Sequence, residues 1–209
     1  MLKNDPYIIG ISGPTGSGKT FITKQLAEKF RNHNFSVEII STDDFYRDLS
    51  HLTFDERTKV NYDDPDSIDF GEFNDVLKRI NQGEKVTINQ YDFKTHTRIN
   101  KQRTFNVANI IIVEGIFAFT DEEVLRNYSL TIFVELDSDL RIIRRIDRDY
   151  KERGRSFNSV VNQYTTTVKL TQELHVLRDK TKADLIIYGN KNQLRIVELI
   201  FRGIVGLAD

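Results

Sequence analysis

A glycine-rich segment near the start of the chain, GPTGSGKT at residues 13–20, restricts the fold more than any other feature of the sequence. It fits the pattern G-x-x-x-x-G-K-[ST], in which backbone N–H groups converge on phosphate oxygens and a helix begins with its positive end toward the anion. A β-rich run, Tyr7–Ser12, precedes the segment, and apolar residues at helical spacing follow it. Both neighbours agree with a phosphate loop that binds a nucleoside triphosphate.

In this interpretation the Lys19 ammonium reaches the β- and γ-phosphates, and the Thr20 hydroxyl can coordinate Mg²⁺. The residues of the loop that we expect to bind the nucleotide are Gly13, Gly16, Ser17, Gly18, Lys19 and Thr20.

Short runs rich in Ile and Val alternate along the chain with longer segments of helical periodicity. Near-continuous apolar runs are typical of strands covered on both faces, as in a parallel sheet. The expected strands are residues 7–12, 36–41, 109–114, 129–135 and 183–188. The expected helices are residues 19–32, 70–81, 121–127, 138–150, 157–177 and 191–205. This order predicts an α/β fold of the P-loop NTPase type, a doubly wound parallel five-stranded sheet with helices on both faces.

One segment interrupts this alternation. Residues 85–90, KVTINQ, alternate in polarity, and after YDFKTHTR a second β-rich run follows at residues 103–107. The pattern predicts a β-hairpin over about residues 85–107 that stands off the main sheet. Because the sequence has no internal repeat, low-complexity tract or linker, we expect one domain over residues 1–209 with this hairpin as an insertion.

The composition argues against several classes of protein. The chain has 30 Lys and Arg against 31 Asp and Glu, a formal charge of −1, whereas binding nucleic acid by bulk electrostatics needs a large positive excess. It has no Cys, which excludes disulfides, thiolate zinc sites and a Cys nucleophile. No stretch approaches the roughly 20 apolar residues of a membrane helix. We therefore expect no nucleic-acid or membrane partner, and a cytoplasmic location.

Acidic residues follow two of the expected strands. STDDFY places Asp43 and Asp44 just beyond the second strand, and NIIIVEG ends the third core strand in Glu114. Ligands of open α/β sheets bind at the carboxyl ends of the strands. One of the two aspartates is therefore a candidate base or Mg²⁺ partner, although Asp after a strand also commonly caps the next helix. Glu114 takes the position at which such folds bring a carboxylate near the metal.

The segment from residue 139 to residue 155 is locally cationic, with seven Lys or Arg and four Asp or Glu. A solvated helix face with i,i+4 ion pairs is the ordinary explanation of such a run, and we expect it for Arg141 and Lys151. Arg144, Arg145 and Arg148 share one face, and Gly154 then breaks the helix between two arginines. Beside a phosphate site, this pattern favours a mobile arginine lid that closes over the nucleotide.

Eight segments, in matching order and spacing, resemble the uridine kinase (uridine–cytidine kinase) family of phosphate-loop nucleoside kinases. They are GPTGSGKT, STDDFY, NYDDPDSID, QYDFKTHTR, VEGIFAF, RRIDRDYKERGR, NQY and ADLII, between residue 8 and about residue 192. The resemblance implies phosphorylation of the 5′-hydroxyl of a pyrimidine ribonucleoside, a small-molecule substrate, with ATP and Mg²⁺ as cofactors. It also implies a homo-oligomer, since family members commonly form tetramers.

The resemblance implies a role for each matched residue. Asp43, in preference to Asp44, would be the catalytic base, helped by Lys19 and Arg148. Arg148 and Arg153 would bind ATP phosphates from the lid, residues 148–157. The implied nucleoside-binding residues are Asp43, Tyr46, Asp66, Tyr91, His96, Arg145, Arg155 and Gln163, with Asp66 on the ribose hydroxyls and Tyr91 and His96 on the pyrimidine. The implied metal site is Thr20, Glu114 and Asp43.

Related small-molecule kinases are the nearest alternative. A phosphoribulokinase or a pantothenate kinase would use the same phosphate loop, but QYDFKTHTR resembles the nucleoside branch. A GTP-dependent switch would carry N-K-x-D, and residues 190–193, NKNQ, lack its Asp. The chain also departs from the family in having Asp64 where D-H-P-D has His, and VKL and RDKTK where the family carries prolines.

Overall fold

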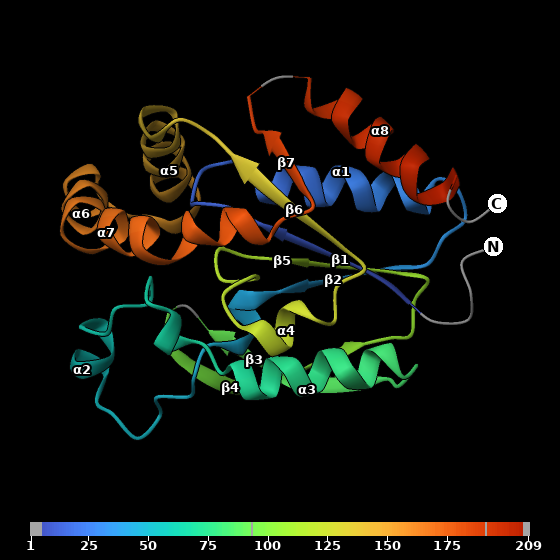
Figure 1. Ribbon diagram of the computed structural model, residues 1–209. Helices are drawn as coiled ribbons and strands as arrows, with labels where there is room; N and C mark the ends of the chain where they lie inside the picture. Colours follow the sequence, from blue (N-terminus) through green and yellow to red (C-terminus); the bar gives the residue numbers. More distant parts are fainter. Residues whose placement is uncertain (1–5, 93, 191, 207–209) are drawn as a thin grey trace.

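A five-stranded parallel sheet forms the centre of the computed structural model, which describes residues 6–92, 94–190 and 192–206 (Figure 1). The strands are β1 (Tyr7–Ser12), β2 (Val37–Ser41), β5 (Ile110–Glu114), β6 (Leu130–Glu135) and β7 (Leu185–Tyr188). Their order across the sheet is β2-β5-β1-β6-β7, and every neighbouring pair is parallel. The predicted fold class and its five strands are therefore confirmed.

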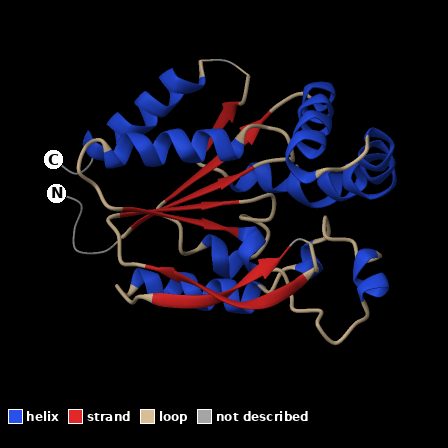
Figure 2. Ribbon diagram, turned by 180° about the vertical axis from the view of Figure 1, so that it is seen from behind, coloured by secondary structure: helices blue, strands red, loops and turns tan. Residues whose placement is uncertain are grey.

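Helices cover both faces of this sheet and its carboxyl edge. They are α1 (Lys19–Arg31), α2 (Phe54–Thr58), α3 (Phe70–Asn81), α4 (Glu122–Leu125), α5 (Ser138–Arg153), α6 (Phe157–Gln163), α7 (Lys169–Thr171) and α8 (Gln193–Gly206). In Figures 1 and 2, α1 and α8 lie on one side of the sheet and α3 and α4 on the other. The strands point toward the end of the molecule that carries α2, α5, α6 and α7.

The side chains of β1 show why the sheet is buried on both faces. Ile8 belongs to a core cluster with Phe73 of α3, whereas Ile9 and Ile11 belong to a second cluster with Phe30 of α1. Successive residues of a strand point to opposite faces, so an uninterrupted apolar strand supplies both cores. No helix in the described part of the chain is long and apolar enough to cross a membrane.

The hairpin forms a second, two-stranded antiparallel sheet of β3 (Val86–Asp92) and β4 (Thr97–Phe105). Its apolar face is packed against the rest of the molecule, because Val86 and Phe105 are almost fully buried in the cluster that contains α3. Arg103 ties β4 to the end of β2: its guanidinium donates to the Ile39 carbonyl at 2.6 Å and to Asp44 at 2.5 Å. The insertion is thus separate from the main sheet, as expected, but firmly anchored beside it.

Several helices differ from the sequence prediction. Helix α5 runs to Arg153, three residues beyond the expected end, and stops where Gly154 adopts φ 65°. The expected helix at residues 157–177 contains two π-helical stretches, Tyr164–Val168 and Gln172–Val176. The expected C-terminal helix begins at Gln193, and Lys191, with which we expected it to start, lies outside the described residues.

Helix α2 was not predicted, although the sequence carries a signal for it. Thr53 caps the backbone N–H of Glu56, and the Glu56 carboxylate accepts the Thr53 N–H at 2.8 Å. This T-x-x-E pattern is a capping box, which marks the start of a helix even when no apolar periodicity follows.

The anchoring of the hairpin can be tested with Phe105→Ala. Removing a fully buried Phe leaves a cavity, so the free energy of unfolding should fall by about 3–5 kcal/mol. The melting temperature should fall by roughly 10 °C. Val107, two residues on and 51% exposed, provides the matched control, and Val107→Ala should change the melting temperature little. Equal, small shifts for both variants in thermal unfolding would show that the hairpin does not share the core.

Candidate active site

The phosphate loop fits closely between the end of β6 and the start of α5. Gly13 and Gly16 adopt φ values of 144° and 76°, which favour glycine. A Cβ atom on Gly13 would lie 2.3 Å from the Val134 carbonyl oxygen, and one on Gly16 would lie 2.5 Å from the Arg141 carbonyl oxygen. These two glycines are therefore required by close backbone packing as well as by the turn.

Two side chains of the loop are poised for phosphate and metal. The Lys19 ammonium is buried and donates to the Pro14 carbonyl at 3.1 Å. Burial lowers the pKa of Lys19 to about 8, against the opposing effect of the Glu114 carboxylate. The Thr20 hydroxyl donates to Glu114 Oε1 at 3.4 Å, which brings together the ends of α1 and β5 as expected.

The pair Thr20 and Glu114 fits Mg²⁺, which prefers oxygen donors and usually binds through one or two protein groups together with substrate phosphates and water. Among the described residues, no three His, Asp or Glu side chains form a metal cage. The protein would thus supply a partial coordination shell, and Asp43 lies close enough to Glu114 for their charges to interact.

The structure separates the two aspartates that follow β2. Asp44 has a structural role: its carboxylate accepts the Ser41 N–H at 3.2 Å and pairs with Arg103 at 2.5 Å. These contacts of Asp44, with Ser41 and Arg103, are not shared by the Asp43 carboxylate. Burial, and then the nearby Glu114 carboxylate, raise the pKa of Asp43 to about 6, although Arg153 opposes this shift. A carboxylate with a pKa near neutrality suits a general base, and the contacts that hold Asp44 also favour Asp43 for this role.

Four rings from three segments form an aromatic cluster beside Asp43. The Tyr46 and Tyr91 ring centroids are 5.0 Å apart, and Tyr62 stacks on His96 at 4.6 Å with an interplanar angle of 13°. The Tyr46 hydroxyl donates to the Tyr62 carbonyl at 3.1 Å. Burial, and to a smaller extent the positive charge of Arg57, lower the pKa of His96, so its imidazole is biased toward the neutral form. The cluster offers flat apolar surface with polar edges, which suits a heterocyclic base.

A buried carboxylate, Asp63, joins the arginines of α5 to this cluster. Arg145 Nη1 lies 3.5 Å from Asp63 Oδ1, and Gln163 Nε2 donates to Asp63 Oδ2 at 3.3 Å. Asp66, which was expected here, is exposed on the short 3₁₀ turn at Pro65–Ser67, and its carbonyl accepts a hydrogen bond from Arg47. The structure does not bring Asp66 to Arg145, because the turn directs residues 63 and 66 to different surroundings.

The expected lid arginines converge on another buried carboxylate. Asp149, fully buried on α5, pairs with Arg145, Arg148, Arg153 and Arg155 at 2.7–3.8 Å. Arg155 Nη1 also donates to Gln163 Oε1 at 2.5 Å. The arginines are thus held on the last turns of a helix and at its end.

The expectation that Arg141 belongs to a solvated face is wrong. Arg141 is 6% exposed, donates to the Leu136 carbonyl at 2.9 Å and to Gln172 Oε1 at 2.6 Å, and lies under the phosphate loop. Burial lowers its pKa. Lys151 does follow the expectation, since it pairs with Asp147 at 2.7 Å on the exposed side of α5.

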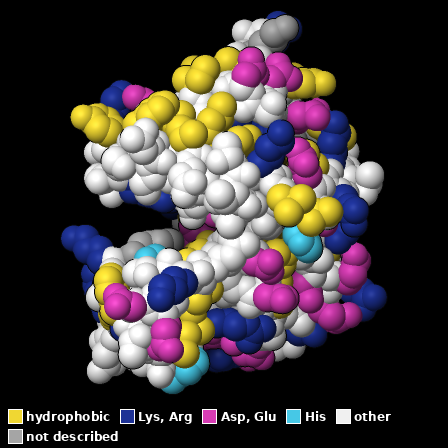
Figure 3. All heavy atoms as spheres, turned by 90° about the vertical axis from the view of Figure 1, so that its left-hand side faces the viewer, with side chains coloured by type: hydrophobic (Ala, Val, Ile, Leu, Met, Phe, Trp, Pro, Cys, Tyr) yellow, Lys and Arg dark blue, Asp and Glu magenta, His cyan; other side chains and the backbone are white. Residues whose placement is uncertain are grey.

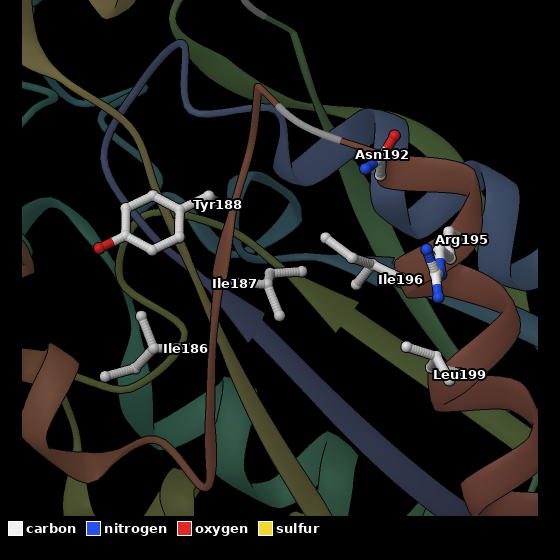
Figure 4. Close-up of a pocket in the computed structure, with 7 residues that line it drawn as sticks. All are labelled: Ile186, Ile187, Tyr188, Asn192, Arg195, Ile196 and Leu199. Atoms are coloured by element: carbon white, nitrogen blue, oxygen red, sulfur yellow. The ribbon is translucent and has the colours of Figure 1, made fainter.

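The surface is hollowed at the end of the molecule toward which the strands point. Figure 3 looks at this end and shows a deep notch between its upper and lower parts. A different, shallow groove lies between β7 and α8 (Figure 4), with Ile186, Ile187 and Leu199 among its lining residues. This groove contains no acidic side chain that could act on a hydroxyl, so the notch is the better place for the chemistry.

Comparison with known proteins agrees with this geometry. Residues 8–194 match the family described as Phosphoribulokinase / Uridine kinase family. The chain belongs to this family. Among its relatives is a protein of Staphylococcus haemolyticus named uridine kinase, 42% identical over 190 residues, which are 90% of this chain and 91% of the relative. Another, of the same name, from Streptococcus uberis is 38% identical over 95% of this chain and 94% of its own.

The fold is also shared with a solved structure of much lower sequence identity. The structure of phosphoribulokinase from Rhodobacter spheroides superposes with a TM-score of 0.62 at 14% sequence identity, over 91% of this chain and 74% of that chain. At this identity the likeness concerns the fold alone, and it supports the P-loop NTPase class.

Several residues of the site could not be singled out from the sequence. NYDDPDSID contains Tyr62 and Asp63, and RRIDRDYKERGR contains Asp149. Neighbouring acidic residues and arginines of the same chemistry prevented the sequence from indicating which of them belong to the site. For Asp149 a weak signal exists, because it stands four residues after Arg145 and four before Arg153, both on one helix face.

We expect Asp43 and Lys19 to shape the pH dependence of catalysis. The base must be ionised, so kcat/KM should fall about tenfold per pH unit below about 6, where Asp43 takes up a proton. It should also fall above about 8, where Lys19 loses its charge before ATP binds. Initial rates from pH 5 to 9, with Mg²⁺ in excess, measure both limbs. A flat profile across pH 6 would contradict the role of Asp43.

The same base can be removed without loss of fold. Asp43→Asn should lower kcat at least about 10²-fold, since a general base is lost. Because burial disfavours the charged carboxylate, stability from Asp43 is lost as pH rises through about 6, and the variant should not melt at a lower temperature at pH 8. Asp44→Asn is the matched control: it should lower the melting temperature but retain kcat within a few-fold.

Proposed function

We propose that the protein is a uridine kinase that transfers the γ-phosphoryl group of ATP to the 5′-hydroxyl of uridine, and also of cytidine, in pyrimidine salvage. One observation carries this proposal: Asp43 lies on the turn between Ser41, which is paired with Glu114 in the sheet, and Tyr46 of the aromatic cluster. A carboxylate therefore stands between the phosphate loop, which Thr20 connects to Glu114, and the rings, and burial raises its pKa to about 6. The family membership and the relatives named uridine kinase support it.

Phosphoryl transfer needs positioning and charge stabilisation more than covalent chemistry. In the proposed reaction Asp43 accepts the proton of the 5′-hydroxyl as the oxygen attacks the γ-phosphorus. Lys19 would hold the β- and γ-phosphates. Thr20 and Glu114 would hold Mg²⁺, which would supply positive charge to neutralise the phosphates. Arg148, with Arg153, stabilises the charge of the transferring group.

The acceptor is held by groups on the other side of Asp43. We propose that Asp63, in place of Asp66, accepts hydrogen bonds from the ribose diol, with Arg145 beside it. This choice is supported by the burial of Asp63 and by its contact with Arg145, whereas Asp66 is exposed. Tyr46, Tyr91 and His96 would enclose the pyrimidine, and Arg155 and Gln163 would close the site from α5 and α6.

The family resemblance further supports a cytoplasmic homo-oligomer, up to a tetramer. The exposed apolar side chains of Ile186 on β7 and Leu199 on α8 are a surface that an assembly of this kind would cover.

The assignment is tested with purified protein, ATP and Mg²⁺ against a panel of acceptors, with ADP formation as the readout. We expect turnover with uridine and cytidine and none with ribulose 5-phosphate or pantothenate, because the described acceptor side has a diol-binding acid and flat rings. The Asp43→Asn protein is the blank for contaminating kinases. Absence of turnover with both pyrimidine nucleosides would refute the proposal.

The choice between two acids in NYDDPDSID makes a separate prediction. Asp63→Asn should raise the KM for uridine about 10- to 100-fold, since a hydrogen bond to a charged group is worth about 1.5–3 kcal/mol. Asp66→Asn, its matched control, should leave KM within twofold.

A deoxynucleoside shows whether Asp63 acts on the diol. Wild-type enzyme should discriminate strongly against 2′-deoxyuridine, and Asp63→Asn should discriminate weakly. The reverse ranking of the two variants would return the role to Asp66.

A further inference from the structure

We propose that Asp149 is a positioning residue that keeps the arginines of the two substrate sites in register, with one carboxylate oxygen serving each site. The inference rests on the proposed function and adds to it a residue that contacts neither substrate. It starts from the burial of Asp149, whose side chain is 0% exposed although four guanidinium groups surround it.

The two oxygens of this carboxylate have different partners. Oδ1 accepts from Arg148 through Nε at 2.9 Å and pairs with its Nη2 at 2.7 Å, and Arg153 Nε lies 3.8 Å from the same oxygen. Oδ2 faces Arg145 Nε at 3.7 Å and Arg155 Nη1 at 3.6 Å. The carboxylate therefore divides the four arginines into two pairs.

The pair on Oδ1 belongs to the phosphate side. The Arg141 carbonyl lies against Gly16 of the phosphate loop, and Arg148 follows seven residues later, about two turns along the same face of α5. Arg153 comes with it, because its Nε lies 3.8 Å from the oxygen that accepts from Arg148. Both guanidiniums are partly exposed, with side-chain exposures of 32% and 48%, so an incoming triphosphate can reach them.

The pair on Oδ2 belongs to the acceptor side. Arg145 Nη2 donates to Gln163 Oε1 at 3.0 Å and its Nη1 lies 3.5 Å from Asp63. Arg155 Nη1 donates to the same Gln163 oxygen at 2.5 Å. These contacts connect the acceptor side to the carboxylate that also holds the phosphate side.

The backbone reinforces this arrangement. The Arg155 N–H donates to the Asp149 carbonyl at 3.1 Å, across Gly154 in its left-handed conformation. Asp149 thus holds Arg155 by a main-chain hydrogen bond and faces its guanidinium at ion-pair distance, because Oδ2 accepts no hydrogen bond from the described residues. Without the carboxylate, the buried guanidinium of Arg145, whose side chain is 4% exposed, would face three further positive charges, and the four groups would separate.

The arrangement predicts how the residue acts during the reaction. ATP phosphates compete with Oδ1 for Arg148 and Arg153, while Oδ2 continues to hold Arg145 and Arg155. Loss of the carboxylate should therefore disturb the alignment of phosphate and hydroxyl, and a misplacement of about 1 Å can cost about 10²-fold in rate. It should not weaken ATP binding, because a competing anion is removed.

The test compares Asp149→Asn, which keeps shape and removes charge, with Asp147→Asn on the same helix. Asp147 is exposed and pairs with Lys151 at 2.7 Å, so its variant should keep kcat and both KM values within twofold. For Asp149→Asn we expect kcat to fall about 10- to 100-fold while the KM for ATP stays equal or falls. Asp149→Glu, which restores the charge one methylene away, should recover part of kcat.

Three results would overturn the proposal. One is a kcat of Asp149→Asn within twofold of wild type. Another is a parallel rise of both KM values with unchanged kcat per folded enzyme, which indicates a structural role only. The third is an Asp149→Glu enzyme no faster than Asp149→Asn, since the charge would then be irrelevant.

If Asp149→Asn does not fold, Asp149→Glu decides alone. A folded Asp149→Glu enzyme with kcat at least threefold below wild type and an unchanged KM for ATP supports the proposal, and one with wild-type kcat refutes it. The wild-type rate on uridine separates the two hypotheses. Absent turnover refutes the proposed function, whereas turnover that is insensitive to residue 149 refutes only the role of Asp149.

Discussion

The contact between the phosphate loop and its two supports is the constraint on which the rest of the site depends. Gly13 lies against the carbonyl of Val134 at the end of β6, and Gly16 lies against the carbonyl of Arg141 in the first turn of α5. Neither approach leaves room for a Cβ atom. Because α5 is held in this way at its start, its later turns, which carry the arginines, are brought beside the loop. These two tight backbone contacts thereby set the distance between the phosphate loop and the arginines of α5.

The buried charged groups of the site lie beside groups of opposite charge. Asp149 forms ion pairs with four arginines, and one of these, Arg145, also forms an ion pair with Asp63. Lys19 and Asp43 are left with pKa values shifted toward neutrality, to about 8 and about 6. The near-zero formal charge of the whole chain conceals this local concentration of buried carboxylates and arginines.

Much of the fold could be predicted because its signals are local. The β-rich runs and the G-x-x-x-x-G-K-[ST] loop depend on periodicity and spacing, and all five predicted strands lie in the sheet. The capping box at Thr53 was also readable, yet α2 is too short for periodicity to reveal it. Helix α5 extends to Arg153 and ends at Gly154, whose left-handed conformation terminates it.

The roles of similar neighbours could not be predicted in this way. Asp43 and Asp44 have the same chemistry, and only the family resemblance, not a local signal, favoured Asp43. For Asp63 and Asp66 the resemblance favoured Asp66, whereas the structure buries Asp63 and exposes Asp66. Arg141 and Lys151 likewise lie on one helix, but one is buried under the loop and the other is solvated.

The sequence by itself determined the α/β class, the phosphate loop and the resemblance to a kinase family, because these depend on residue types at fixed spacing. Only the tertiary structure decided which carboxylates meet which arginines. The physical reason is that burial and charge pairing arise between segments as distant as residues 63 and 163, and within one short turn Asp63 is buried while Asp66, three residues later, is exposed.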